Sequence, residues 1–101
     1  MAYQIYETDT FSKLYQAMEK AEQEWIEKIK HQLVLNPKAG RPLKFEWFRE
    51  KKFGNKRMYY LIYRDVSKIL LVSFGTKKEQ QAIINQVVEN KERYRKIIES
   101  V

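Results

Sequence analysis

The sequence of 101 residues contains no cysteine, a single histidine, three glycines and two prolines. The lack of cysteine excludes disulfide bonds and metal sites built from thiolates. Because His31 is the only histidine, a Ser-His-Asp triad or a site of several histidines would have to be built around it alone. The longest aliphatic run, Ile69 to Val72, is far too short to cross a membrane. We therefore expect no metal, no cofactor and no membrane contact.

The N-terminal stretch MAYQIYETDT lacks the basic and apolar segments of a signal peptide, so we expect a cytoplasmic protein. Hydrophobic residues make up 44% of the chain and aromatic residues 14%. This apolar content is enough for a packed core, and the length is that of one domain. We expect a single domain over residues 1–101.

Positive charge is the most uneven property of the sequence. Residues 1–36 hold four Lys or Arg and six Asp or Glu, and residues 79–101 hold four of each kind. Residues 37–78 hold twelve Lys or Arg against three Asp or Glu, a net charge of +9 within a total of +7. A localised basic segment is typical of a surface that binds a polyanion.

The N-terminal third predicts a strand followed by helix. Alternating residues indicate a short strand at roughly 2–7, and Thr8, Asp9 and Thr10 supply helix-capping side chains. Apolar residues then recur with a period near 3.6 over about 10–34. The pattern leaves open one long helix or a helical hairpin broken near Glu19 to Ala21.

The rest of the chain predicts a loop, a meander and a helix. Residues 36–42 contain Pro37, Gly40 and Pro42 and indicate a loop. Alternation from Leu43 predicts a strand that continues to about residue 51, with a hairpin turn at 53–56. Residues 57–64 and 68–74 are apolar on both faces, with a tight turn at 65–67, and a helix follows over about 78–99. These elements predict an α+β fold: a three-stranded antiparallel meander with the helices on one face and a cationic opposite face.

The segment FREKKFGNKRMYY carries five cations within nine residues. The period of a strand places Arg49 and Lys51 on one face, and we expect Arg57 to lie opposite them on the return strand. Lys77 and Lys78 open the last helix, whose N-terminus adds positive potential. Converging cations of this kind can hold a phosphate and stabilise its transition state without a metal. A solvated strand face and a site for an acidic protein remain alternatives.

Two other residue types are candidates for the same surface. Tyr59 or Tyr63 can face it and stack on a base. Glu50 can serve as a general base beside Arg57. His31, near the end of the first helical region, is expected to be an ordinary surface residue.

Several motifs resemble those of the RelE/ParE toxins of type II toxin–antitoxin systems. These are N-P-x-x-G-x-P-L at 36–43, L-K-x-x-x-F-R-E-K at 43–51, K-R-M-Y-Y at 56–60 and K-K-E-Q-Q at 77–81. RelE-type members cleave mRNA in the ribosomal A site, and ParE-type members act on DNA gyrase. Members of both types are usually silenced by an antitoxin that wraps the toxin.

The resemblance implies a toxin with an antitoxin partner, acting as a ribosome-dependent mRNA endoribonuclease. A ParE-like gyrase inhibitor, an inactive homologue or an RNA-binding module are the alternatives, and a homodimer or a toxin–antitoxin hetero-oligomer is left open. Carried over by position, the catalytic candidates are Arg49, Lys51, Arg57 and Lys78. The expected RNA contacts are Arg41, Lys44, Lys52, Lys56 and Lys77. The sequence departs from the nuclease members after Lys78, because no Tyr or His follows until Tyr94.

Overall fold

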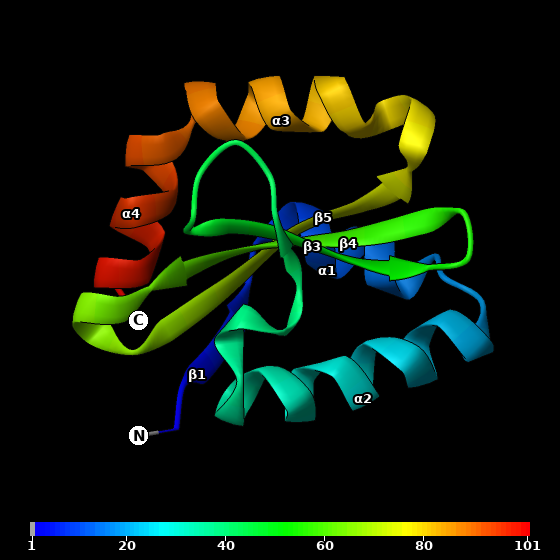
Figure 1. The fold of residues 1–101 in the computed structure, drawn as a ribbon, viewed down its shortest axis with the longest axis horizontal. Helices are drawn as coiled ribbons and strands as arrows, with labels where there is room; N and C mark the ends of the chain where they lie inside the picture. Colours follow the sequence, from blue (N-terminus) through cyan, green and yellow to red (C-terminus); the bar gives the residue numbers. More distant parts are fainter. Residues whose placement is uncertain (1) are drawn as a thin grey trace.

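The computed structural model describes residues 2–101, which build a five-stranded sheet with helices on both faces (Figure 1). The order across the sheet is β1-β5-β4-β3-β2, in which β1 and β5 are parallel and the other neighbours antiparallel. The strands are β1 (Gln4–Glu7), β2 (Arg41–Pro42), β3 (Phe48–Phe53), β4 (Lys56–Tyr63) and β5 (Lys68–Thr76). The predicted α+β class and its N-terminal strand and meander are confirmed.

The first helical region is a hairpin of α1 (Asp9–Gln16) and α2 (Lys20–Leu35). The Thr8 hydroxyl accepts a hydrogen bond from the Phe11 backbone N–H at 3.0 Å and begins α1. Glu19 and Glu22 form a capping box that begins α2, two residues after α1 has ended at its C-cap Ala17. Of the two alternatives, the structure has the hairpin, because its second helix carries its own N-cap.

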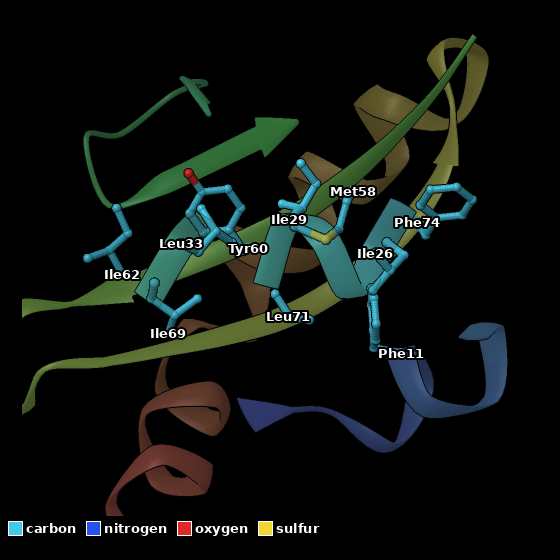
Figure 2. Close-up of a cluster of buried hydrophobic side chains, with 10 residues drawn as sticks. All are labelled: Phe11, Ile26, Ile29, Leu33, Met58, Tyr60, Ile62, Ile69, Leu71 and Phe74. Atoms are coloured by element: carbon cyan, nitrogen blue, oxygen red, sulfur yellow. The ribbon is translucent and has the colours of Figure 1, made fainter. Parts of the chain in front are cut away.

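Helices α1 and α2 cover one face of the sheet. The buried hydrophobic side chains between these helices and the sheet form one cluster. Figure 2 shows that in it the side chains of both helices lie against β4 and β5. The buried members are Phe11, Ile26, Ile29, Leu33, Met58, Tyr60, Ile62, Ile69, Leu71 and Phe74.

The other face is covered by α3 (Gln80–Glu89) and α4 (Lys91–Glu99), which lie on the opposite side from α2 in Figure 1. Their buried residues Ile83, Val87, Tyr94 and Ile98 pack on Phe48, Tyr59, Leu61, Leu70 and Val72. The prediction that the helices share one face is therefore wrong. Strands β4 and β5 are apolar on both sides, and each side must be shielded from water. The last helical region is also divided, at Asn90, where α3 ends and α4 begins.

The segment between β2 and β3 is a loop, although its alternating aromatic residues predicted a strand from Leu43. The Phe48 backbone N–H donates to the Phe45 carbonyl at 3.1 Å, which makes a turn. The Phe45 and Trp47 rings stack with centroids 4.7 Å apart, beside the α3 and α4 core. The turn folds β2 back onto β3, so that Arg41 lies opposite Glu50.

The remaining turns form where the sequence predicts them. The β3–β4 hairpin turns at Gly54, whose φ of 60° is one that glycine adopts without strain. A short 3₁₀ helix, η2 (Arg64–Val66), joins β4 to β5 and ends at Ser67, whose φ is 52°. The first loop contains η1 (Pro37–Ala39), and η3 (Lys77–Glu79) leads into α3. Within residues 2–101 no helix is long and apolar enough to cross a membrane.

Candidate functional site

The register of the β3–β4 hairpin divides the basic segment between the two faces of the sheet. Lys52 lies opposite Arg57, whereas Lys51 lies opposite Met58 and Arg49 opposite Tyr60. Directly opposed residues of an antiparallel pair point to the same face. Lys52 and Arg57 therefore point toward α3, and Lys51 and Arg49 toward α2. The expectation that Arg57 shares a face with Arg49 and Lys51 is wrong, because the two-residue turn pairs odd positions of one strand with even positions of the other.

Arg49 is buried and holds a loop. Its Nε donates to the Glu46 carbonyl at 3.0 Å, its Nη1 to the Gly40 carbonyl at 2.8 Å, and its Nη2 pairs with the Glu46 carboxylate. Lys51 lies beside the same loop, with its Nζ 3.5 Å from the Ala39 carbonyl oxygen. The Arg49 guanidinium is thus engaged with the chain itself and positions the loop that precedes β2.

Tyr60 fixes the same loop from the sheet below. Its hydroxyl donates to the Pro37 carbonyl at 2.7 Å and accepts from the Gly40 backbone N–H at 2.9 Å. A Cβ at Gly40 would lie 2.5 Å from the Glu50 carbonyl oxygen, so only glycine fits there without a shift. The loop is therefore rigidly placed, and it delivers Arg41 to the other face of the sheet.

On the α3 face, Glu50 is the centre of a buried charge cluster. Its side chain is 1% exposed, and three side chains from different elements converge on it. Arg57 Nε of β4 lies 3.0 Å from Oε1, Arg41 Nη2 of β2 lies 3.0 Å from Oε2, and Gln80 Nε2 of α3 donates to Oε1 at 2.8 Å. The cluster therefore holds one carboxylate between two guanidinium groups.

Several buried donors of this cluster have no hydrogen-bond partner within residues 2–101. They are Arg57 Nη1, the Tyr59 hydroxyl, and Arg57 Nε, which lies 3.0 Å from Glu50 Oε1 without the alignment of a hydrogen bond. The Gln80 amide lies beside Tyr59 but donates to Glu50. Burial, reinforced by the Glu50 carboxylate, raises the pKa of Tyr59, which keeps its hydroxyl protonated at neutral pH. A buried donor without a partner is costly and uncommon, and these groups could donate to a ligand oxygen only after the side chains that cover them move.

Exposed cations and a helix start surround the cluster. Lys52 is exposed on the strand beside Arg57, and Gly75 of β5 lies on the other side of Arg57. Immediately after β5, Lys77 and Lys78 are exposed in η3, where Thr76 and Glu79 form the capping box that leads into α3. Hydrogen bonds from Thr76 lower the pKa of Glu79. The arrangement joins buried Arg57 to a rim of lysines, as a site for a phosphate requires.

The remaining predicted residues lie elsewhere. Lys56 Nζ pairs with Glu22 of α2 at 2.6 Å, and Lys44 lies over the Phe45 ring. Of the nine candidates, the fold brings Arg41, Lys52 and Arg57 together on the α3 face, with Lys77 and Lys78 nearby. The other four candidates, Arg49, Lys51, Lys56 and Lys44, do not join them. Tyr59 is completely buried, which excludes base stacking, and Tyr94 belongs to the α4 core. No sequence pattern points to Gln80, because a glutamine in a helix has no motif, and only the fold places it over Glu50.

Comparison of the sequence with family models and with curated proteins finds no match. Solved structures do match. A mutant of the Escherichia coli toxin RelE in the free state superposes with a TM-score of 0.76 over 89% of this chain and 98% of that one, at 16% identity. The chain has the RelE fold. The RelE–RelB complex from Pyrococcus horikoshii matches with a TM-score of 0.68 at 15% identity, over 76% of this chain and 97% of that one. The RelBE2 toxin–antitoxin complex from Mycobacterium tuberculosis matches with a TM-score of 0.66 at 16% identity, over 76% of this chain and 100% of that one.

The RelE fold is what the motifs of the basic segment led us to expect. At identities of 14–16% these similarities concern the backbone and the order of elements. The side chains of the Glu50–Arg57 cluster are therefore interpreted from their own geometry on the RelE fold.

Proposed function

We propose that this protein is the toxin of a type II toxin–antitoxin system and cleaves mRNA as a metal-independent endoribonuclease at the Glu50–Arg57 cluster. The observation that carries the proposal is Arg57, a buried guanidinium that pairs with Glu50 through Nε and has no partner at Nη1, on the same face of a RelE fold as Lys52. The excess of positive charge in residues 37–78 supports a polyanionic substrate.

In this proposal Arg57 binds the phosphate at which the RNA is cut. Its Nη1 donates to a phosphate oxygen once the substrate has moved Arg41, its Nε stays beside Glu50, and Lys52 at the rim adds a second positive charge. These donors are fixed before substrate binds, so they stabilise the charge that develops on phosphorus without reorganisation.

Glu50 acts as the general base. Its carboxylate accepts the proton of the ribose 2′-hydroxyl, and the 2′-oxygen attacks the adjacent phosphorus. The bond from phosphorus to the 5′-oxygen breaks, and this oxygen takes a proton from the Lys52 ammonium. The products are a 2′,3′-cyclic phosphate and a 5′-hydroxyl, and no other reactant is consumed.

Substrate reaches Glu50 by displacing Arg41. The Arg41 side chain is 67% exposed and is held by a strand of only two residues, whereas Glu50 beneath it is 1% exposed. When a phosphate draws Arg41 away, Glu50 loses one neighbouring positive charge and becomes a stronger base. Arg41 thus covers the carboxylate in the free protein and contacts RNA in the complex.

The chemistry of the cut ends tests this proposal. We expect purified protein added to translating ribosomes to cut mRNA and leave 5′-hydroxyl ends, which a kinase can label without prior phosphatase treatment. Glu50→Asp shortens the base by one methylene and keeps the charge, so we expect slower cleavage at the same positions. Ends with a 5′-phosphate, or a Glu50→Asp rate equal to that of the parent, would contradict the mechanism.

A second candidate function is inhibition by binding alone, as a ParE-like gyrase inhibitor, an inactive toxin homologue or an RNA-binding module. It is favoured by one observation: Glu50 is paired with two guanidinium groups and an amide, which neutralises it. In that case expression would arrest growth, or RNA would bind, without any cut in mRNA. The ribosome assay therefore separates the two functions.

An antitoxin is the expected partner in the cell. Three of the matching structures are toxin–antitoxin complexes of RelE and RelB proteins. A fourth is RelE in complex with an antitoxin peptide. By analogy we propose that residues 1–101 make one toxin domain, that it acts in the cytoplasm, and that an antitoxin chain silences it. Co-expression with the product of the adjacent reading frame tests this by restoring growth.

A further inference from the structure

A groove of about 520 Å³ runs between the segment after β2 and helix α3. It adjoins the Glu50–Arg57 cluster without belonging to it. Arg41 lines the groove and also pairs with Glu50, and Gln80 and Gln81 are neighbours on α3, one bonded to Glu50 and the other lining the groove. The other lining residues are Pro42, Leu43, Lys44, Ile84, Asn85, Val88 and Glu89.

The groove combines apolar side chains with two polar amide side chains. Leu43 and Ile84 are half-buried and Val88 is 36% exposed, so the groove has an apolar lining open to solvent. Along α3, Gln81 Nε2 donates to Asn85 Oδ1 at 3.0 Å. This bond leaves the Gln81 carbonyl oxygen as an acceptor and the Asn85 amino group as a donor, neither with another partner among residues 2–101.

A nucleobase has the matching chemistry. Its faces are flat and apolar, and its edge presents a donor next to an acceptor. Arg41 and Lys44 against the single carboxylate of Glu89 leave a net positive charge, which suits the phosphates on either side of such a base.

Resting on the function proposed above, we propose that this groove binds the base of a nucleotide next to the phosphate held by Arg57, and that Gln81 and Asn85 read its edge. The groove is then the specificity site of the protein, and the Glu50–Arg57 cluster its phosphate site. Because Arg41 belongs to both the groove and the cluster, one strand of RNA can occupy the two sites together.

Fluorescence anisotropy with labelled RNA hexamers of adenylate, uridylate or cytidylate tests the inference. We expect the affinities of the wild type for its best and worst hexamer to differ by about fivefold or more. Asn85→Ala and Gln81→Ala should reduce this ratio to below about twofold. Gln86→Ala, on the same helix but outside the groove, should leave the ratio unchanged. Lys52→Ala should weaken all three hexamers alike.

The outcomes separate the two proposals. If the hexamers bind and Lys52→Ala weakens them, but Asn85→Ala and Gln81→Ala keep the parental ratio, the base site is wrong and the phosphate site stands. If Asn85→Ala instead weakens a labelled hexaglutamate peptide and no RNA, the groove receives an acidic protein and the base site is again wrong. If the wild type binds no hexamer, the base site is wrong, whereas the proposed function is decided separately by cleavage of mRNA on translating ribosomes.

Discussion

Tyr59 and Tyr60 are neighbours on β4 with opposite surroundings. Both are fully buried, on opposite faces of the sheet. The Tyr60 hydroxyl makes two hydrogen bonds that fix the loop before β2, whereas the Tyr59 hydroxyl makes none within residues 2–101. The same functional group is therefore structural at one position and without a hydrogen-bond partner at the next.

This contrast predicts opposite effects of removing each hydroxyl. Tyr60→Phe leaves the Gly40 N–H and the Pro37 carbonyl without their partner, so we expect the free energy of unfolding to fall by about 1–3 kcal/mol. Tyr59→Phe removes an unpaired buried hydroxyl, so we expect no loss of stability or a small gain. Urea unfolding followed by circular dichroism measures both. Equal losses in the two variants would show that the Tyr60 hydrogen bonds are not what holds the loop.

Gly40 predicts a second effect at the scale of one residue. In Gly40→Ala the new methyl group meets the Glu50 carbonyl oxygen at 2.5 Å and the Tyr60 hydroxyl at 2.8 Å. We expect a loss of about 1–3 kcal/mol in the free energy of unfolding. Gly54→Asn is the control, because nothing lies within 4 Å of that position and Asn tolerates its φ of 60°. If Gly40→Ala unfolds at the same urea concentration as the parent, the loop is less tightly fixed than described.

At the scale of elements, an ion pair joins the β3–β4 hairpin to α2. Lys56 Nζ lies 2.6 Å from Glu22 Oε2, and the Glu22 carboxyl is largely buried. The hydrogen bond from Lys56, helped by the Glu19 backbone N–H, lowers the pKa of Glu22 below its usual 4.5 despite burial. Lys56 therefore stabilises the hairpin through Glu22 on the face away from the proposed site.

The lowered pKa predicts how this pair responds to acid. A carboxyl group with a lowered pKa in the folded state adds stability above its unfolded pKa, and that stability is lost as pH falls through the folded value. We expect the wild type to lose stability from about pH 5 downward, and Glu22→Gln to lose less over the same range. Glu24→Gln, on the exposed side of α2, is the control and should follow the wild type. Parallel curves for Glu22→Gln and the wild type would refute the pair's contribution.

The elements themselves were largely predictable from local sequence. The cap at Thr8, the glycine turn at Gly54 and the 3.6-residue periods act over a few residues, so they are visible in the chain. The alternation of Leu43, Phe45 and Trp47 predicted a strand wrongly, because two partly buried, stacked rings in a turn produce the same alternating pattern. The position of the helices on both faces follows from β4 and β5, because strands that are apolar on both sides need cover on both sides.

The candidate site was predictable only in part. The sequence predicts the basic segment 37–78, its positive charge and the proximity of Glu50 to Arg57. In the structure Arg57 and Lys52 lie on one face. The choice between Lys51 and Lys52 depends on the register of the hairpin, where a shift of one residue exchanges the two faces. The role of Arg49 as a clamp on the loop, and of Gln80 over Glu50, depends on contacts between residues distant in sequence.

At the scale of the whole molecule, the RelE fold separates two tasks between two faces. The α2 face uses Arg49, Tyr60 and Lys56 to fix the loop and the hairpin. The α3 face gathers Glu50 and Arg57 under the start of α3. The basic character of the segment therefore contributes to stability on one face and to the proposed phosphate site on the other.

Adjacent lysines on opposite faces give the most direct test of this account. Lys51 and Lys52 have the same charge, and Lys51 lies on the α2 face opposite Met58 while Lys52 lies beside Arg57. The measurement is growth after induced expression of Lys51→Ala and Lys52→Ala at matched protein levels, with urea unfolding to verify the fold of each. We predict that Lys52→Ala relieves growth arrest and that Lys51→Ala remains as toxic as the parent. Relief by Lys51→Ala with full toxicity of Lys52→Ala would place the site on the other face and contradict the account.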